Sequence, residues 1–346
     1  MSLSTKALFA GFCFGALLVG PLAFASDVAY VSNENGGVSV VDIATLKVIK
    51  EIDVGGKTPR GIGLTKDGRY LVTANKTSGD MSVIDTQTGE VVKRIALGPG
   101  AEFLRVHGDK AFVTYEPEGM RDDDEKKGDK ENEKELPAQI AIVDIAAGKV
   151  LVTFASGVET EGMEFSADGK RVLTTNEGDE TVSIYNIADG KHLRTVSTKA
   201  VGKRPRGLAA LPGGKGYVVT FENSSNLVVF DEDFNVIKNV PTKAGPNGVA
   251  FDPTGKLMVV SAARASALQV FDASTYALIK EAPIGKRCWH FTYTPDATKI
   301  LVACGRTNDL QVVDAKTFAP AAPIVGFNLP WGVVTFPKAN GSLDVP

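Results

Sequence analysis

Residues 57–97 read KTPRGIGLTKDGRYLVTANKTSGDMSVIDTQTGEVVKRIAL. This stretch contains four short runs in which apolar and polar residues alternate, separated by turns rich in Gly, Asp, Asn and Pro. Such alternation indicates strands, because successive side chains of a strand point to opposite faces of its sheet. We predict four strands over 61–65, 70–74, 81–85 and 91–97, joined by turns and one polar loop.

The third of these strands ends in Val-x-Val-x-Asp or a close variant, and this motif recurs along the chain. In its seven copies the last residue is Asp42, Asp85, Asp144, Asn186, Asp231, Asp272 and Asp314. Consecutive copies lie 41 to 45 residues apart, except for one spacing of 59 that contains an acidic insertion. A period near 40 built from strands alone is typical of a four-stranded propeller blade. The sequence therefore predicts an all-β fold, a seven-bladed β-propeller.

The two ends of the chain complement each other. The first repeat begins at 29–33 and lacks an innermost strand, whereas the chain ends with a spare strand at 331–336. We predict that these two strands pair in one blade. Such pairing closes the ring and removes two exposed sheet edges.

The N-terminus has the features of a secretory signal peptide. Lys6 precedes an apolar run over 7–22, and Ala23-Phe-Ala25 then offers small residues where a signal peptidase cleaves. We predict that residues 1–25 are removed, that the protein is periplasmic, and that 26–346 form a single propeller domain. An uncleaved membrane anchor is the alternative.

Charge is concentrated in one segment. Residues 116–137 contain ten acidic and five basic side chains, while the whole chain has a formal net charge of −3. The remainder is nearly neutral, which argues against nucleic acid as a ligand. We predict that 116–137 is a flexible, solvated insertion on the loop face of the propeller. A docking arm for a basic partner is the alternative.

The predicted working face is one mouth of the central channel, where loops lead into the innermost strands. Alignment of the repeats places one residue of each blade there: Arg60, Glu161, Arg206, Asn247, His290 and Trp331, with Glu102 as the seventh to within one residue. Two guanidinium groups and an indole suit an anion with an apolar or planar body. The alternative is a mouth that is polar only because it meets water.

Two cysteines remain after the predicted cleavage, Cys288 and Cys304. They are equidistant from Asp296, the centre of a predicted hairpin turn, so they lie opposite each other on the two strands. We predict a disulfide, which an oxidising periplasm favours. The alternatives are a soft-metal or redox site that also uses His290, and two unlinked thiols.

Three segments resemble a known repeat. Residues 30–33, 71–75 and 172–176 read YVSN, LVTAN and VLTTN, and they resemble the YVTN repeats of bacterial β-propellers. The resemblance covers the mature chain and implies the same fold.

A narrower resemblance concerns the segments GKRPRG at 202–207, GKRCWH at 285–290 and LPWGVV at 329–334. They are similar to the β-propellers associated with PQQ-dependent alcohol catabolism, although that family would have valine where this chain has Cys288. The acidic insertion also departs from the family. The resemblance implies a periplasmic accessory role near quinoprotein dehydrogenases and no established catalytic residues.

The sequence thus favours a non-catalytic accessory propeller linked to PQQ-dependent alcohol oxidation. The expected partner is a periplasmic protein, such as a quinoprotein dehydrogenase, its cytochrome or a solute-binding protein, and a small anionic ligand is also considered. We expect a monomer that needs no cofactor and has no membrane span after cleavage.

Two alternatives stay open. A lactonase- or cycloisomerase-like enzyme would use Glu161 or His290 as the base, with Arg60 and Arg206 as electrostatic stabilisers. A binder of a small molecule, a metal or haem would use Arg60, Arg206, His290 and Trp331.

Overall fold

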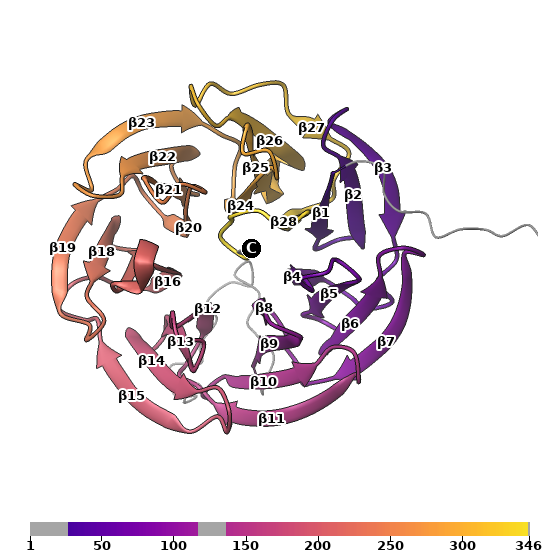
Figure 1. Ribbon diagram of the computed structural model, residues 1–346, viewed down its shortest axis with the longest axis horizontal. Helices are drawn as coiled ribbons and strands as arrows, with labels where there is room; N and C mark the ends of the chain where they lie inside the picture. Colours follow the sequence, from indigo (N-terminus) through magenta and orange to yellow (C-terminus); the bar gives the residue numbers. More distant parts are fainter. Residues whose placement is uncertain (1–26, 117–135, 345–346) are drawn as a thin grey trace, which may run out of the picture.

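The computed structural model describes residues 27–116 and 136–344. This part of the chain forms seven four-stranded antiparallel sheets around a central axis, like the blades of a propeller (Figure 1). The predicted fold class is therefore confirmed. The predicted signal peptide, 1–25, and most of the acidic insertion, 117–135, lie outside the described residues.

Each blade is a meander whose first strand lies nearest the axis, except that in the first blade the last strand of the chain takes this place. From the axis outward, the first blade contains β28 (Pro330–Phe336), β1 (Val28–Asn33), β2 (Val38–Asp42) and β3 (Lys47–Ile52), and the second contains β4 (Pro59–Leu64), β5 (Tyr70–Asn75), β6 (Asp80–Asp85) and β7 (Glu90–Ala96). The third contains β8 (Leu104–His107), β9 (Lys110–Tyr115), β10 (Gln139–Asp144) and β11 (Lys149–Ala155), and the fourth contains β12 (Thr160–Phe165), β13 (Arg171–Asn176), β14 (Thr181–Asn186) and β15 (His192–Ser197).

The remaining blades follow the same plan. The fifth contains β16 (Pro205–Ala210), β17 (Tyr217–Phe221), β18 (Asn226–Phe230) and β19 (Val236–Pro241), and the sixth contains β20 (Pro246–Phe251), β21 (Leu257–Ala262), β22 (Ala267–Asp272) and β23 (Leu278–Pro283). The seventh contains β24 (Cys288–Tyr293), β25 (Lys299–Cys304), β26 (Asp309–Asp314) and β27 (Ile324–Val325). Two single-turn 3₁₀ helices of the described chain are η1 (Pro212–Gly214) and η2 (Gly305–Thr307).

Burial follows the distance of a strand from the axis. Every residue of the innermost strand β4 is buried, whereas the outermost strand β7 alternates between exposed residues and residues that are half-buried or, at Ile95, buried. The apolar core lies between adjacent sheets, where Val72 and Val83 of the second blade share a buried cluster with Val106 and Val113 of the third. Each sheet therefore depends on its neighbours to cover its faces.

The ring closes as the sequence predicts. β28 pairs antiparallel with β1, so that Tyr30 lies opposite Val334 and Val31 opposite Val333. Hydrogen bonds between the two ends of the chain thus complete the first blade. The inner edge of β1 is paired with β28 and is not left free.

Adjacent blades meet through a repeated contact near the channel mouth. The Thr175 hydroxyl of β13 donates to the carbonyl oxygen of Arg206 at 2.6 Å, and the Thr220 hydroxyl of β17 donates to that of Asn247 at 2.7 Å. In each case a second strand holds the innermost strand of the next blade. The contact fixes the spacing of the blades around the axis.

The same carbonyl groups explain why glycine occupies the third position of several innermost strands. A Cβ atom on Gly162 would lie well within 3.0 Å of the Arg206 carbonyl oxygen, and one on Gly207 would lie well within 3.0 Å of the Asn247 carbonyl oxygen. Backbone atoms cannot move aside as a flexible side chain can. Only glycine therefore lets neighbouring innermost strands approach this closely.

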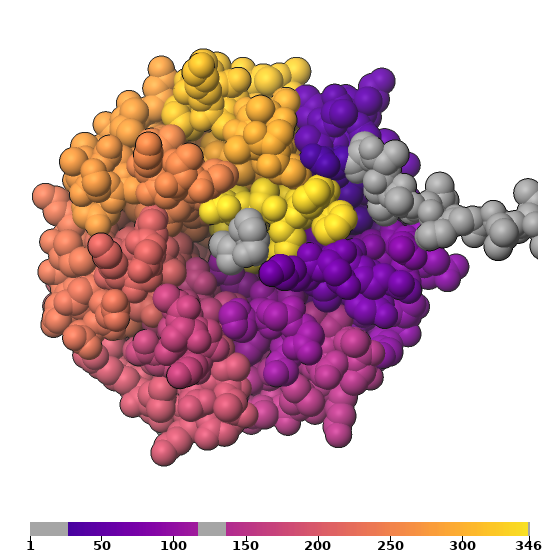
Figure 2. Space-filling model, in the orientation of Figure 1, coloured from indigo at the N-terminus to yellow at the C-terminus, as the bar shows by residue number. Residues whose placement is uncertain are grey.

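After β28 the chain turns back into the ring. Gly341 bridges to β24, Leu343 is 1% exposed, and Lys338 forms an ion pair with Asp344 at 2.7 Å. This C-terminal segment, 337–344, lies at the centre of the ring in Figures 1 and 2. The repeat pattern does not predict it, because the segment follows the last strand of the last repeat.

We expect Gly207→Ala to lower the free energy of unfolding by about 1–3 kcal/mol, because the added methyl group would push the innermost strands of two blades apart. Urea denaturation measures the change. Gly36→Ala is the control, since the nearest atom to its new Cβ would be Asn33 Cβ at 3.4 Å, an ordinary contact. Equal destabilisation of the two variants would contradict the close-approach role of Gly207.

Candidate functional site

β-bulges direct the predicted mouth residues toward the axis. In β16, Pro205 pairs with Phe221, but the next pair, Leu208 with Val219, is shifted by one residue. The same shift occurs at the start of β4, β12, β20 and β24. A bulge leaves residues unpaired and bends the strand, which re-aims their side chains. The residues inside these bulges include Arg60, Glu161, Arg206, Asn247 and His290.

Most of the predicted residues meet in one cavity. Its lining includes Glu161, Arg206, Asn247, His290 and Trp331. Phe103, Trp289 and Ser342 add to the wall, so the C-terminal segment contributes to the cavity. The volume is about 20 Å³, which is room for about one water molecule. Arg60 and Glu102 lie outside this lining and form an ion pair with each other.

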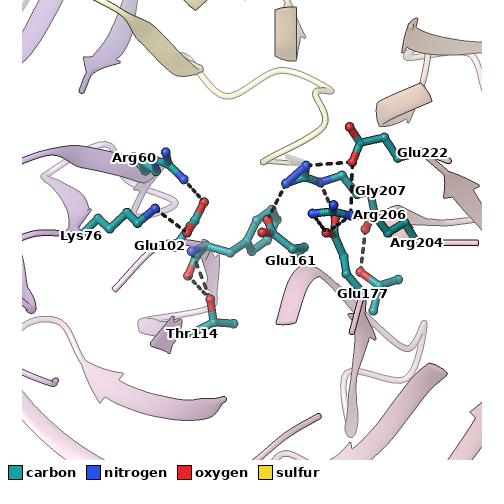
Figure 3. Close-up of polar contacts among 12 residues, drawn as sticks. Arg60, Lys76, Glu102, Thr114, Glu161, Glu177, Arg204, Arg206, Gly207 and Glu222 are labelled. Atoms are coloured by element: carbon teal, nitrogen blue, oxygen red, sulfur yellow. Dashed lines mark hydrogen bonds and ion pairs between the residues drawn. The ribbon is translucent and has the colours of Figure 1, made fainter. Parts of the chain in front are cut away.

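Arg206 is surrounded by carboxylates (Figure 3). Its Nη2 atom lies 3.2 Å from Glu161 Oε2, and its Nε atom lies 2.6 Å from Glu177 Oε1. Its Nη1 atom donates to Glu222 Oε2 at 3.1 Å. Arg204 also pairs with Glu177, at 2.5 Å. Each nitrogen of the Arg206 guanidinium group therefore faces a carboxylate of the protein.

Arg60 belongs to a second cluster of ion pairs. It pairs with Glu102 and, at 3.0 Å, with Glu34 Oε2. Lys76 Nζ lies 3.7 Å from Glu102 Oε2. The sequence analysis expected Arg60 and Arg206 to be available to an anion. In the structure both guanidinium groups are instead paired with carboxylates of the protein.

A second ring of charged residues at the mouth was not predicted from the sequence. The residue directly after the second strand of a blade is charged in five blades: Glu34, Lys76, Glu116, Glu177 and Glu222. These positions lie on the same face as the innermost-strand turns, and four of the five form ion pairs with the mouth residues. The repeat contains the signal, because the position is found by alignment of the second strands.

Crowding and burial make several of these carboxyl groups hard to ionise. Burial raises the pKa of Glu161 to about 8, with Arg206 opposing the rise and Glu102 adding to it. Burial, with repulsion from Glu161 and Glu102, raises the pKa of Glu116 to about 8. Burial likewise raises the pKa of Glu177 to about 7. Glu161 is thus mainly protonated at neutral pH and is a stronger base than an ordinary glutamate once it ionises.

His290 is a neutral imidazole in an aromatic wall. Burial, with the nearby charge of Arg206, lowers its pKa to about 3. Its ring centroid lies 4.3 Å from that of Trp331 and 6.0 Å from that of Phe103. Its Nδ1 atom is hydrogen-bonded to Ser342 Oγ at 3.1 Å. The side chain is therefore a weak base that contributes polarity rather than charge.

A disulfide joins Cys288 of β24 to Cys304 of β25. The two residues are register partners, as the hairpin symmetry predicts, with their Cα atoms 3.9 Å apart. Closer to the turn, Phe291 lies opposite Val302, which is one residue out of the symmetric register. The bulge in β24 restores that register at the cysteines. The bond anchors the strand two residues before His290.

Two family models match parts of the chain. Residues 143–235 match the model described as Lactonase, 7-bladed beta-propeller, and residues 13–102 match the Cytochrome D1 heme domain. Neither match covers half of the chain. A comparison with curated proteins finds no match.

Solved structures share the fold. A proposed 6-phosphogluconolactonase from Bacteroides uniformis is 16% identical, with a TM-score of 0.72 over 90% of this chain and 99% of that one. The periplasmic gluconolactonase of Pseudomonas aeruginosa is 15% identical, with a TM-score of 0.72 over 92% and 99%. Hydrazine synthase of Kuenenia stuttgartiensis is 20% identical, with a TM-score of 0.67 over 83% and 92%. At such identities these likenesses establish the propeller fold alone.

The comparisons correct one prediction. The expected non-catalytic accessory role, with its link to PQQ-dependent alcohol oxidation, is contradicted by the match of residues 143–235 to the Lactonase family model. This match favours the enzyme alternative of the sequence analysis.

The Cytochrome D1 match raises the question of a haem. The cavity, at about 20 Å³, is far too small for a porphyrin, and the histidine that lines it is hydrogen-bonded through Nδ1 to Ser342. The described residues of the channel mouth therefore do not fit this group. Within the same residues, no set of three or more His, Cys, Asp or Glu side chains is placed to hold a metal ion.

The predicted periplasmic location stays a prediction. Its basis, the segment 1–25, lies outside the described residues. Across residues 27–116 and 136–344, no helix has the length and hydrophobicity needed to cross a bilayer.

We expect the protein to lose stability as the pH rises from 5 to 9. Glu116, Glu161 and Glu177 have pKa values raised by folding, so the folded chain keeps protons that the unfolded chain has released. Their stabilising contribution is complete below the ordinary pKa of 4.5 and is lost as the pH rises to about 8. Melting temperatures at pH 5 and pH 9 measure the loss.

A pair of variants isolates the contribution of Glu161. Glu161→Gln should narrow the difference between the two melting temperatures, because glutamine does not ionise. Asp272→Asn is the control: hydrogen bonds from Ser274 and Thr275 lower the pKa of Asp272 to about 2, so its contribution disappears only below its ordinary pKa of 3.8. The same pH dependence in Glu161→Gln and the unmodified protein would contradict the raised pKa.

Proposed function

We propose that this protein is a lactonase that hydrolyses its substrate at the mouth of the central channel. The observation that supports this most is the cavity in which the buried Glu161 carboxyl, the Arg206 guanidinium and the Asn247 amide meet. The segment that matches the Lactonase model, 143–235, includes both Glu161 and Arg206. A lactonase needs a base for water and a donor for the developing oxyanion, and these residue types supply both.

The proposed step is attack of water on the lactone carbonyl. Glu161, as the carboxylate, accepts a proton from water while the water oxygen forms a bond to the carbonyl carbon. The bond from that carbon to the ring oxygen then breaks, and Glu161 returns the proton to the departing alkoxide. The product is an open-chain hydroxy acid. The cavity has room for about one water molecule beside Glu161, so the proposal places the attacking water in the cavity and the lactone at its opening.

Asn247 is suited to stabilise the oxyanion. Its Nδ2 atom is buried and has no hydrogen-bond partner within the described chain. A buried amide hydrogen without a partner is costly, so an acceptor from the substrate would relieve that cost. The carbonyl oxygen of a lactone is such an acceptor, and it becomes a stronger one as negative charge develops.

Arg206 is a positioning residue in this scheme. Its ion pair with Glu161, at 3.2 Å, orients the carboxyl group and opposes the rise in pKa that burial causes. His290, which the sequence analysis considered as a base, is too weak a base with its pKa lowered to about 3. We therefore assign the base to Glu161 alone.

We also propose that the enzyme acts in the periplasm. The signal-peptide pattern before residue 26 supports this location, and the Cys288–Cys304 disulfide suits an oxidising compartment. Retention of the chain in the cytoplasm after fractionation of the source cells would contradict this location.

We expect the purified protein to hydrolyse a member of a lactone panel, with acid release followed by a pH indicator. The rate should rise with pH toward a plateau above about 8, because Glu161 must ionise to act. Glu161→Gln should lower kcat by about 10²-fold or more with a small change in KM.

The matched control is Glu164→Gln. Glu164 is a buried glutamate of the same strand, β12, that pairs with Arg105 rather than lining the cavity. The Glu164→Gln variant should keep most of the lactonase activity. Hydrolysis no faster than in buffer, or equal loss in the two variants, would refute the proposal.

A further inference from the structure

The mouth of the channel contains several cationic side chains, but carboxylates of the protein already pair with them. The three nitrogens of Arg206 face Glu161, Glu177 and Glu222 at 3.2, 2.6 and 3.1 Å. Glu222 in turn pairs with Arg264 at 2.9 Å. A phosphate or carboxylate of a substrate would have to compete with these glutamates for the same hydrogens.

The cations of the second cluster, around Arg60, are also paired with carboxylates of the protein. Arg60 pairs with Glu34 and Glu102, and Glu102 also lies 3.7 Å from Lys76. The Nε atom of Arg60 has no hydrogen-bond partner among the described residues, but Arg60 does not line the cavity, whereas Asn247 does. Its guanidinium group lies beside the Trp289 ring, 5.7 Å from the centroid.

Ionisation of the carboxyl groups at the mouth is already unfavourable. Burial, together with repulsion between the groups, raises the pKa of Glu116 and of Glu161 to about 8. A dianionic phosphate bound beside them would raise these pKa values further, because like charges disfavour ionisation. It would therefore oppose the ionisation of Glu161 that hydrolysis requires.

The cavity offers a different set of contacts. Asn247 Nδ2 is an uncharged donor without a partner among the described residues. Beside it, Phe103, Trp289 and Trp331 provide aromatic surface, with the two indole centroids 6.2 Å apart. One neutral donor and an aromatic wall match a carbonyl group on an uncharged body.

We infer that the substrate is a small uncharged lactone, and that lactones bearing a phosphate are excluded by the glutamates that occupy the arginines. This inference rests on the proposed lactonase function. In it, Asn247 binds the lactone carbonyl oxygen, and the rest of the ring, which a cavity of about 20 Å³ cannot hold, lies at the opening of the cavity beside the aromatic wall.

The test compares two substrates that differ only in charge, glucono-1,5-lactone and its 6-phosphate. We expect kcat/KM to be at least about tenfold higher for the uncharged lactone. Equal rates, or preference for the phosphate, would overturn the inference while leaving the lactonase proposal intact. No Glu161-dependent hydrolysis of either lactone, or of the panel above, would instead refute the lactonase proposal.

Two variants test the reason for the selectivity. Glu222→Gln should narrow the ratio of the two kcat/KM values, because it frees hydrogens of Arg206 and Arg264 for a phosphate. Glu281→Gln is its control, since Glu281 pairs with Lys243 at 2.7 Å on the outermost strand β23. A ratio unchanged by Glu222→Gln would overturn the explanation by occupied arginines.

The assignment of Asn247 has its own test. Asn247→Ala should lower kcat for the uncharged lactone by about 10²–10³-fold, the loss that follows removal of an oxyanion donor. Asn239→Ala, on the outermost strand β19, should retain activity because Asn239 bonds to Asn226 instead. Equal activity of the two variants would overturn the role of Asn247.

Discussion

The contact between successive innermost strands is the constraint on which the rest of the structure depends. A carbonyl group of one blade lies against a glycine of the previous blade and accepts a hydrogen bond from a hydroxyl group of that blade. The carbonyl of Arg206, for example, lies against Gly162 and accepts from Thr175. The carbonyl can reach that position because a bulge bends the strand. The bulge that joins the blades therefore also turns the Arg206 side chain toward the axis.

Electrostatics at the mouth follow from this geometry. Side chains from several blades converge on a narrow axis, so charges that are far apart in sequence become neighbours. Glu161 is buried beside other carboxyl groups, and its partner Arg206 also pairs with Glu177 and Glu222. The result is a carboxyl group with a pKa of about 8, a property suited to proton transfer. It supports the proposed catalytic role of Glu161.

The sequence predicts most of the fold because each blade is encoded locally. Strand alternation and the turn residues located the four strands of the second blade to within two residues at each end. Most mouth positions were also predictable, because they occupy one place in the repeat, but in the seventh blade that place belongs to Trp289, one residue before the predicted His290. The partners of Arg206 were not predictable, since Glu177 and Glu222 become its neighbours only through the curvature of the ring. The C-terminal segment was not predictable either, because its contacts are with a strand, β24, to which no repeat connects it.

The repeat separates the position of the site from its chemistry. The bulge and the glycine occur together in five blades, yet the residue before the glycine is Arg60 in one, Glu161 in another and Asn247 in a third. The backbone contact does not depend on that side chain, so the residue can differ between blades without cost to the ring. A propeller can therefore acquire a base, an oxyanion donor and an aromatic wall one blade at a time. Corresponding backbone positions of several blades thus become one asymmetric site, and the asymmetry determines which ligand fits.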